Sequence, residues 1–310
     1  MKISLITVCW NSAAVIRTAL DSVFAQSTPA DLEIEYIVVD GGSTDGTVEI
    51  LKEYATRPVP EHRMLGSTPI SFRYISERDA GMYDALNKGI RMSTGEVIGW
   101  LNADDVLAAD DVLAKVAAAF EANPDIDGTY ADIRFVKPLV KGSDEPETSG
   151  SPSEGIPGLE RSGNRRSPRY SAEGLPEEEL PALRALPTLR YCSGKHFRPW
   201  MFRFGTQTAH PSTFFRRSAF DRWGFYSLDY GMFGDFELLC RFIWRHRAKM
   251  RYLPFCTTVM RSGGASTNGW RTTLKINRTD LRALNANGCY SNLLFLYSRY
   301  FFKIWGFLFK

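Results

Sequence analysis

Two adjacent carboxylates, Asp104 and Asp105, follow a short apolar run that ends at Leu101. The run, residues 96–101, predicts a buried strand, so both carboxylates should lie at the carboxyl edge of a sheet, where open α/β folds hold their ligands. Neighbouring carboxylates repel each other, and a hard divalent cation that carries phosphate oxygens relieves this repulsion. The pair therefore suggests a site for a metal–diphosphate ligand, although Asp-Asp pairs also begin many surface helices.

A third carboxylate, Asp40, ends another apolar run and is followed by two glycines. It can accept hydrogen bonds from a nucleobase N–H or from ribose hydroxyls, while Gly41 and Gly42 let a ligand approach the backbone. A turn in which Asp40 bonds its own backbone explains the pattern equally well. The first strand is followed by Cys9-Trp10-Asn11, not by the glycine-rich loop of a dinucleotide or P-loop site, so both classes are disfavoured.

The composition of the 310 residues is that of an ordinary globular protein, with 44% hydrophobic and 24% charged residues. A net charge of +3 is too small to indicate a nucleic-acid partner. Five dispersed cysteines lack metal-ligand spacing, which is typical of reduced thiols. We also expect no signal peptide and no transmembrane span, so the sequence predicts a cytoplasmic protein.

Strands that alternate with helices over residues 1–135 predict an α/β fold, with a mainly parallel central sheet flanked by helices. Residues 141–190 are rich in Pro, Gly and Ser, which predicts a flexible insertion, as a passive loop in preference to a lid that recognises an acceptor. A second half is expected at 191–275, with a helix over 235–247. The expected strands of the first half are 3–8, 35–40, 72–76, 96–101 and 130–136, and its helices follow residue 11 and span 45–54, 84–92 and 110–121.

The C-terminal residues 276–310 are expected to form an amphipathic helical tail. On a helix, Asn292, Arg299, Lys303 and Lys310 fall near one stripe, and most other positions of the final segment are Leu, Phe, Tyr or Trp. A basic, aromatic-rich helix of this kind can lie in a membrane interface. Docking on its own domain or on a partner is the alternative.

Three ordered motifs, Thr7–Asn11, Tyr36–Thr47 and Gly95–Asp105, resemble those of the family 2 glycosyltransferases. This resemblance implies the nucleotide-diphospho-sugar transferase (GT-A) fold and an enzyme that transfers a sugar. Glu77–Gly89 is similar to the subgroup that builds bacterial surface polysaccharides. The resemblance covers residues 1–135 closely and 195–270 more loosely.

The resemblance implies a donor pocket in the first half of the chain. Asp40 would contact the uracil or ribose of the donor, and Trp10 would stack near the base. Thr7 and the backbone after it would line the same pocket, joined by Asp79 and Asn87.

The segment from Asn102 to Asp105 matches the D-x-D metal motif of the family, with Asp104 as the carboxylate on the metal side. Its first position departs from the motif, because Asn102 stands where an acid is usual. An amide can still bond the ribose or a metal-bound water, but one negative charge is lost. The resemblance implies Mg²⁺ or Mn²⁺ as the metal.

The second half resembles the family's base-carrying segment at Gly234–Arg241, with Asp235 at the catalytic position. A carboxylate at a helix start can take the proton from an acceptor hydroxyl as that hydroxyl attacks the anomeric carbon. A plain helix cap is the structural alternative. Gly234 stands where the family usually has Glu, so a neighbouring charge is missing.

Two further residues are weaker candidates for contact with the acceptor or the diphosphate. His210 precedes Pro211–Arg217, a stretch that recurs in the subgroup, and it either serves the acceptor or diphosphate or is structural. Arg261 begins an expected mobile loop, residues 261–266, which either closes over phosphates or forms a simple turn.

Together, these features and the resemblance predict an inverting, metal-assisted glycosyltransferase that uses a nucleotide-diphospho-sugar, in the first place a UDP-sugar. The acceptor would be a polyprenyl-diphosphate-linked or other glycan, reached by a protein that is peripheral on the inner face of the cell membrane. Two alternatives remain. One is a nucleotidyltransferase, which normally has a glycine-rich phosphate loop after its first strand. The other is a non-catalytic sugar-nucleotide-binding scaffold of a polysaccharide assembly complex.

Overall fold

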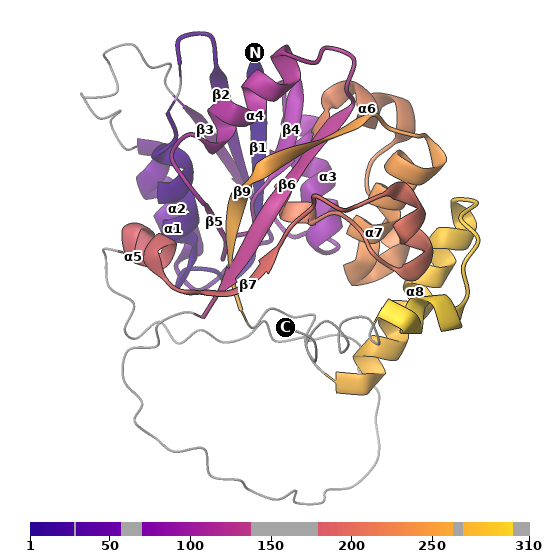
Figure 1. Cartoon of the computed structure of the whole chain (residues 1–310). Coiled ribbons are helices and arrows are strands. Elements are labelled where there is room, and N and C mark those ends of the chain that lie inside the picture. Colours follow the sequence, from indigo (N-terminus) through magenta and orange to yellow (C-terminus); the bar gives the residue numbers. More distant parts are fainter. Residues whose placement is uncertain (28, 57–69, 138–178, 263–268, 300–310) are drawn as a thin grey trace, which may run out of the picture.

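A computed structural model of the chain describes residues 1–27, 29–56, 70–137, 179–262 and 269–299 (Figure 1). The strands are β1 (Lys2–Cys9), β2 (Glu33–Asp40), β3 (Ser71–Ser76), β4 (Val97–Trp100), β5 (Val106–Leu107), β6 (Gly128–Val136), β7 (Thr188–Cys192), β8 (Thr213–Arg216) and β9 (Met250–Arg261). The α-helices are α1 (Ile16–Phe24), α2 (Thr47–Thr56), α3 (Met82–Met92), α4 (Val112–Glu121), α5 (Glu179–Ala185), α6 (Arg217–Trp223), α7 (Gly234–Leu239) and α8 (Gly269–Ala286).

All nine described strands belong to one sheet, in the order β3-β2-β1-β4-β8-β6-β9-β5, with β7 also paired to β6. Strands β1 to β4 are mutually parallel, and β9 is parallel to β6. Strand β8 is antiparallel to both of its neighbours, and β5 and β7 are antiparallel to β9 and β6. The predicted α/β fold is confirmed, but the sheet is mixed, because β8 re-enters it in the opposite direction.

Helices cover both faces of this sheet, because its inner strands are apolar on both sides. In β1, Ile3 and Leu5 belong to one core cluster and Ile6 belongs to the other. Helices α1, α2 and α4 pack in the first cluster, and α3, α6, α7 and α8 pack in the second (Figure 1). The carboxyl ends of β1, β2 and β4 are thereby held at one edge of a rigid layer.

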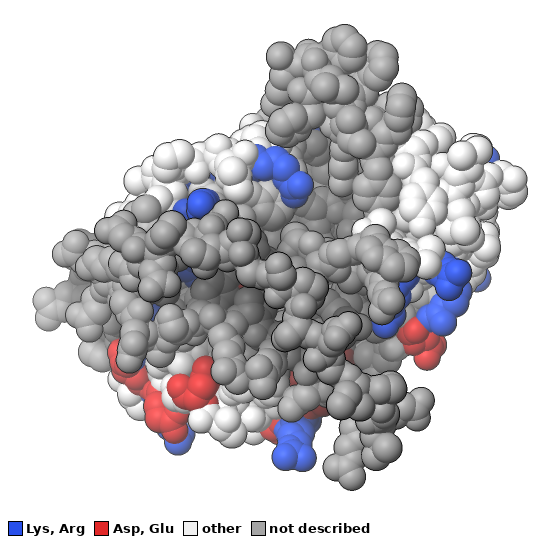
Figure 2. Space-filling view, turned by 90° about the horizontal axis from the view of Figure 1, so that it is seen from below, with Lys and Arg blue, Asp and Glu red and all other residues white. Residues whose placement is uncertain are grey.

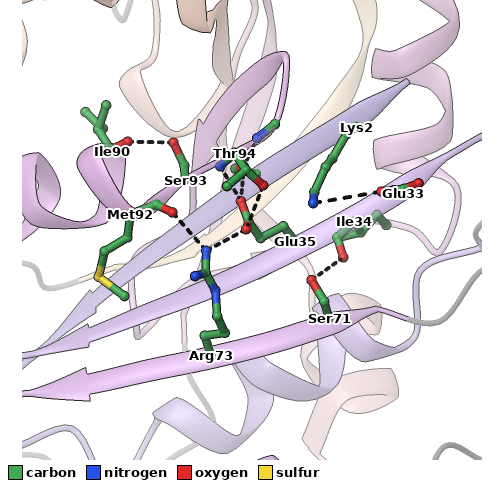
Figure 3. A network of polar contacts seen from close by, with 12 residues as sticks. Lys2, Glu33, Ile34, Glu35, Ser71, Arg73, Ile90, Met92, Ser93 and Thr94 are labelled. Atoms are coloured by element: carbon green, nitrogen blue, oxygen red, sulfur yellow. Dashed lines mark hydrogen bonds and ion pairs between the residues drawn. The ribbon is translucent and has the colours of Figure 1, made fainter.

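A buried carboxylate joins three of the parallel strands near their starts (Figure 3). Glu35 of β2 accepts hydrogen bonds from the Ser4 hydroxyl of β1 at 2.5 Å and from Arg73 of β3 at 2.6 Å. Its oxygens also accept from the backbone N–H and the hydroxyl of Thr94, at 2.7 and 3.0 Å, just before β4. Burial alone would raise the pKa of Glu35, but these hydrogen bonds and the Arg73 charge outweigh it and lower the pKa.

The predicted C-terminal boundary of the flexible insertion, residue 190, is wrong. Helix α5 and the start of β7 lie within residues 179–190. Leu183 of α5 is 6% exposed and packs in a small core with Val106, Val136 and Val259. Leu180 and Leu186 pack against this small core and add to the burial of the segment. The rest of the predicted insertion, residues 141–178, lies outside the described residues.

One member of the predicted basic stripe of the C-terminal helix, Arg299, does not lie on an exposed face in the structure. Residues 293–299 are helical, and Leu296 is fully buried. The Arg299 guanidinium bonds Asp280 at 3.1 Å and the carbonyl of Gly205 at 2.7 Å, so this cation anchors the helix to its own domain. The predicted positions from residue 300 to the end, with Lys303 and Lys310, lie outside the described residues.

The other predicted helix of the second half is shorter than expected. Over the predicted range 235–247, helix α7 gives way to a π-helical turn at Cys240–Arg245. Among the helices that the structure describes, none has the length and apolar character needed to cross a membrane.

The Glu35 contacts predict a pH-dependent contribution to stability. Because its pKa is lowered in the folded state, this contribution is present above about pH 4.3, the ordinary pKa of Glu, and disappears as the pH falls through the folded-state value. Glu35→Gln should lower the free energy of unfolding by about 1–3 kcal/mol at pH 7, and the loss should shrink below pH 4. Urea unfolding across pH measures this. Glu33→Gln, at an exposed position of the same strand, is the control, and equal losses for both variants would contradict the prediction.

Candidate functional site

Hydrogen bonds join the loops that follow β1 and β2 at one edge of the sheet. Asn11 adopts a left-handed conformation, with φ of 49°, and its side-chain oxygen accepts from the backbone N–H of Thr44 at 2.9 Å. Asp45 accepts from the backbone N–H groups of Ala13 at 3.0 Å and of Thr47 at 3.1 Å. Two loops that are distant in sequence therefore present a single preorganised surface beyond the strand ends.

Asp40 lies at this edge, fully buried beneath the turn that follows β2. Its Oδ2 accepts from the backbone N–H groups of Gly42 at 3.1 Å and Ser43 at 2.9 Å, and from the Ser76 hydroxyl at 2.6 Å. Its Oδ1 accepts from the hydroxyl of Ser43 and from the thiol of Cys9. Asp40 thus organises the turn in this structure, and a nucleotide contact would require one of these donors to move.

Trp10 and Asp79 both lie close to the Gly41 backbone. A Cβ atom at Gly41 would lie 2.7 Å from Asp79 Oδ2 and 3.5 Å from Trp10 Cδ1, so a side chain at this position would require Asp79 to shift. Asp79 is fixed by the backbone N–H of Gly81, which donates to its Oδ1 at 2.8 Å. The Trp10 side chain is 44% exposed, and an exposed indole beside a bare backbone can stack on a base.

Two of the expected pocket residues instead have structural contacts. The Thr7 side chain is fully buried, and its hydroxyl shares a hydrogen bond with the Tyr36 hydroxyl at 3.0 Å. The Asn87 amide bonds both the N–H and the carbonyl of Tyr226, each at 2.9 Å. Thr7, a fully buried residue paired with Val38 of β2, is therefore not exposed to a ligand, while Asn87 joins the second half of the chain to α3.

The acidic cluster forms the tight turn between β4 and β5 and does not begin a surface helix. The Asp105 backbone N–H donates to the carbonyl of Asn102 at 3.1 Å, and the Asn102 amide donates to Asp105 Oδ2 at 2.8 Å. An acid at position 102 would bring a second carboxylate against Asp105. The amide therefore removes a repulsion at this point and adds a hydrogen bond.

Burial and charge perturb both carboxylates of this turn. Burial raises the pKa of Asp105 well above its ordinary value, and repulsion from Asp104 adds to the rise. Burial also raises the pKa of Asp104, although the Arg261 charge opposes it. Arg261, expected in a mobile loop, is instead the last residue of β9, 5% exposed, and donates to the carbonyl of Asp104 and the hydroxyl of Thr18.

The described residues contain no group of three or more His, Cys, Asp or Glu side chains that could enclose a metal. Asp105 is nevertheless buried and the adjacent Asp104 is half-buried, and a cation would relieve the repulsion between these two acids. Mg²⁺ usually takes only one or two protein carboxylates and completes its shell with phosphate oxygens and water. The cluster fits a metal of that kind, brought in with a diphosphate.

Asp235 lies in the first turn of α7, half-buried, and both of its oxygens accept hydrogen bonds. The Tyr83 hydroxyl is 3.1 Å from Oδ1, and the Gln207 amide nitrogen is 3.1 Å from Oδ2. At the preceding Gly234, a Cβ atom would lie 2.9 Å from carbons of the Tyr83 ring. The expected site of the base is thus built by contact between α3, α7 and the segment before β8.

A series of ring contacts links Asp235 to the end of β4. Trp100 stacks on His210, with centroids 4.3 Å apart, and His210 Nε2 shares a hydrogen bond with the Tyr226 hydroxyl at 2.7 Å. Tyr226 in turn stacks on Tyr83 at 5.2 Å, which bonds Asp235. Burial lowers the pKa of His210 to about 4, against the opposing charge of Asp235, so this ring is neutral at neutral pH. His210 therefore has a structural role in the described structure.

Sequence reasoning missed Tyr83, Gln207 and Tyr226. Their contacts with one another or with Asp235 join distant segments, 152 residues apart for Tyr83 and Asp235, and leave no local pattern. The one available signal was the position of Tyr83 inside the motif Glu77–Gly89.

Neither the cavity described below nor the surface charge of the described residues points to a further site at this edge of the sheet. A cavity of about 600 Å³ is lined by residues from three segments, but none of the predicted site residues lines it. Its lining residues are Pro199, Ile243, Trp244, Arg245, Arg247, Ala248, Asn287 and Gly288. In the described part of the face seen from below, basic and acidic side chains are scattered among uncharged ones, without the continuous basic stripe of a nucleic-acid groove (Figure 2).

Comparison with curated proteins finds relatives over less than half of the chain. A PGL/p-HBAD biosynthesis glycosyltransferase of Mycobacterium bovis is 38% identical over 130 residues, which are 42% of this chain and 46% of that protein. An uncharacterized glycosyltransferase of Nostoc sp. is 30% identical over 150 residues, 48% of this chain and 42% of the relative. The chain thus matches about half the length of these relatives.

Solved structures share the fold over nearly the whole chain. S. aureus TarS 1-349 in complex with UDP-GlcNAc aligns with a TM-score of 0.52 and 16% identity, covering 92% of this chain and 66% of that one. The mannosyltransferase PcManGT from Pyrobaculum calidifontis, in complex with GDP-Man and Mn²⁺, aligns with a TM-score of 0.54 and 18% identity, covering 94% and 65%. At these identities the likeness shows the GT-A fold.

The family itself is identified by a sequence model that spans the N-terminal half of the chain. The model described as Glycosyl transferase family 2 matches residues 4–163, slightly more than half of the chain. The match includes β1, β2 and β4 and the edge where Trp10, Asp40 and Asp104 lie. The chain therefore belongs to glycosyl transferase family 2.

Proposed function

We propose that this protein transfers a sugar from a nucleotide-diphospho-sugar to an acceptor hydroxyl, with inversion at the anomeric carbon. The observation that carries the proposal is the contact series from Trp100, at the end of β4, to Asp235, at the start of α7. This contact series links the strand that leads into the acidic turn to the candidate base. A donor diphosphate at Asp104 and a base at Asp235 are the two parts that an in-line displacement requires.

In this mechanism Asp235 acts as the general base. Its carboxylate takes the proton of the acceptor hydroxyl while the hydroxyl oxygen forms its bond to the anomeric carbon. The bond to the diphosphate oxygen breaks on the opposite face of the sugar, which inverts the configuration. A bound Mg²⁺ or Mn²⁺ would be held by Asp104 and would supply positive charge for the departing diphosphate.

The donor side is best suited to a nucleotide with an exposed stacking face. Trp10 offers that face, and Asp79 and the turn around Asp40 offer carboxylate oxygens and hydroxyls beside it. We favour a UDP-sugar, because the sequence motifs resemble enzymes that use uridine donors. Two fold neighbours are complexes with UDP-GlcNAc and with GDP-Man, so the experiment has to compare both nucleotides.

For the acceptor, we propose a polyprenyl-diphosphate-linked glycan of bacterial surface-polysaccharide synthesis, met at the inner face of the cell membrane. The C-terminal part of the described chain supports this idea with four exposed apolar side chains. Their exposed fractions are 65% for Tyr290, 38% for Leu293, 76% for Leu294 and 39% for Tyr297. Aromatic and leucine side chains of this kind partition into a bilayer interface.

A non-catalytic scaffold that binds sugar nucleotides is the second candidate. Asn102 and Gly234, which replace usual acids, are the observations that favour it. Both substitutions have local explanations in the structure, since Asn102 bonds Asp105 and Gly234 admits the Tyr83 ring. Turnover of a donor separates the two candidates.

The stacking face of Trp10 should be measurable as nucleotide affinity. Trp10→Ala should weaken the binding of UDP by about tenfold or more, because base–aromatic stacking contributes about 1–3 kcal/mol per base. Calorimetric titration with UDP and Mn²⁺ checks this. Trp200→Ala is the matched control, because Trp200 is also exposed, at 56%, and lies outside the donor edge. Unchanged UDP affinity of Trp10→Ala would contradict the stacking role.

Donor turnover tests the proposed function directly. The purified protein, given Mn²⁺ or Mg²⁺ and a panel of UDP-, GDP- and dTDP-sugars, should release nucleoside diphosphate from one donor, and EDTA should abolish the release. Asp104→Ala should lose the metal dependence together with most activity. Asp235→Asn should lower kcat by about 10²–10⁴-fold while donor affinity stays within about twofold.

Asp125→Asn is the control for these variants, because Asp125 is exposed at the surface and pairs with Lys249. It should behave as wild type. If no donor of the panel is turned over and none binds with metal, the transferase proposal is rejected. Wild-type turnover by both Asp104→Ala and Asp235→Asn would instead reject the assigned roles.

A further inference from the structure

The Asp235 carboxylate is held by neutral donors from two other elements. Tyr83, at the start of α3, shares its hydroxyl proton between Asp235 Oδ1 and the carbonyl oxygen of Met232, each at 3.1 Å. Gln207, in the segment before β8, donates its amide to Asp235 Oδ2 at 3.1 Å. A surface Asp rotates freely about its terminal torsion. Two donors on opposite oxygens stop that rotation, so the remaining lone pairs of Asp235 point in fixed directions.

The Tyr83 hydroxyl is well suited to this task. Its ring is 4% exposed and stacks on Tyr226 at 5.2 Å, so the hydroxyl has little freedom to move. Burial and the neighbouring Asp235 charge raise the pKa of Tyr83 well above its ordinary value. The phenol therefore stays protonated, and stays a donor, throughout the neutral pH range.

Gly234 makes room for this arrangement. A Cβ atom there would come within 2.9 Å of the Tyr83 ring carbons, closer than real Cβ contacts occur. The ring thus occupies the space in which a side chain at position 234 would begin. The acid that the family usually has beside its base is replaced here by a phenol from α3.

Gln207 makes its contact with Asp235 although its own oxygen is left unsatisfied. Its side-chain Oε1 is buried and has no hydrogen-bond partner among the residues that the structure describes. Buried polar atoms without partners are rare in native structures, and each calls for an explanation such as a catalytic role, strain or a bound water. A side chain selected only for stability would be expected to satisfy both ends of its amide.

We propose that Tyr83 and Gln207 are positioning residues that aim the Asp235 carboxylate at the acceptor hydroxyl. This inference rests on the proposed function, because it assigns a role in the same transfer step. Neither side chain takes the proton. They hold the base in the orientation in which a lone pair meets the attacking hydroxyl.

The test uses the full chain with the donor that wild type turns over in the panel, with water as the acceptor, and measures nucleoside diphosphate release. Tyr83→Phe and Gln207→Met should each lower kcat by about 10- to 100-fold, with the donor KM within about twofold of wild type.

Tyr54→Phe is the matched control. Tyr54 is also a buried tyrosine whose hydroxyl donates to an aspartate, Asp21, at 2.6 Å, but it lies on α2. It should leave kcat unchanged. Circular dichroism and thermal unfolding confirm that each variant is folded, and Gln207→Met provides an independent test if Tyr83→Phe is not.

Two results would overturn the inference while leaving the proposed function intact. One is that both variants match Tyr54→Phe in kcat while Asp235→Asn is inactive. The other is that they raise only the donor KM. If wild type turns over no donor, the proposed function has failed, and the positioning role falls with it.

Discussion

The close approach of two phenylalanines of β8 to two glycines holds the halves of this protein together. A Cβ atom on Gly99 of β4 would lie 2.3 Å from the Phe214 ring, and one on Gly128 of β6 would lie 2.7 Å from the Phe215 ring. Because both positions lack a side chain, the phenylalanine rings of β8 can pack over them, and β8 pairs with both strands in the antiparallel direction. The segment leading into β8 then brings His210 against Trp100 at the end of β4.

The candidate site contains several carboxylates, and each has a different kind of hydrogen-bond or ion-pair partner. Asp40 is satisfied by the turn that it organises, and Asp105 by the amide of Asn102. Glu237, two residues after Asp235, forms an ion pair with Arg241 at 2.9 Å. Asp235 is held by a phenol and an amide. A general base benefits from this difference, since a cation in direct contact would weaken its attraction for a proton.

The sequence indicates the parallel half of the sheet well, because its strands are short apolar runs followed by polar residues at their ends. The positions of Asp40 and Asp104 at one edge follow from that pattern alone. The second half is harder, since β8 and β9 become strands only through pairing with β4 and β6. Arg299 shows the same limit: helical spacing places it on a polar stripe, but burial beside Asp280 reverses that expectation. Contacts between distant segments leave no periodicity to read.

The packing of Tyr83 on Gly234 also restricts how this sequence can change. A side chain cannot be added at position 234 while the ring stays in place. Loss of the ring, in turn, would remove a hydrogen-bond donor from Asp235, and an ionised acid at position 234 could not take its place, because a carboxylate only accepts hydrogen bonds. Positions 83 and 234 are therefore coupled by their packing, and a side chain at 234 can be accommodated only together with a change at 83.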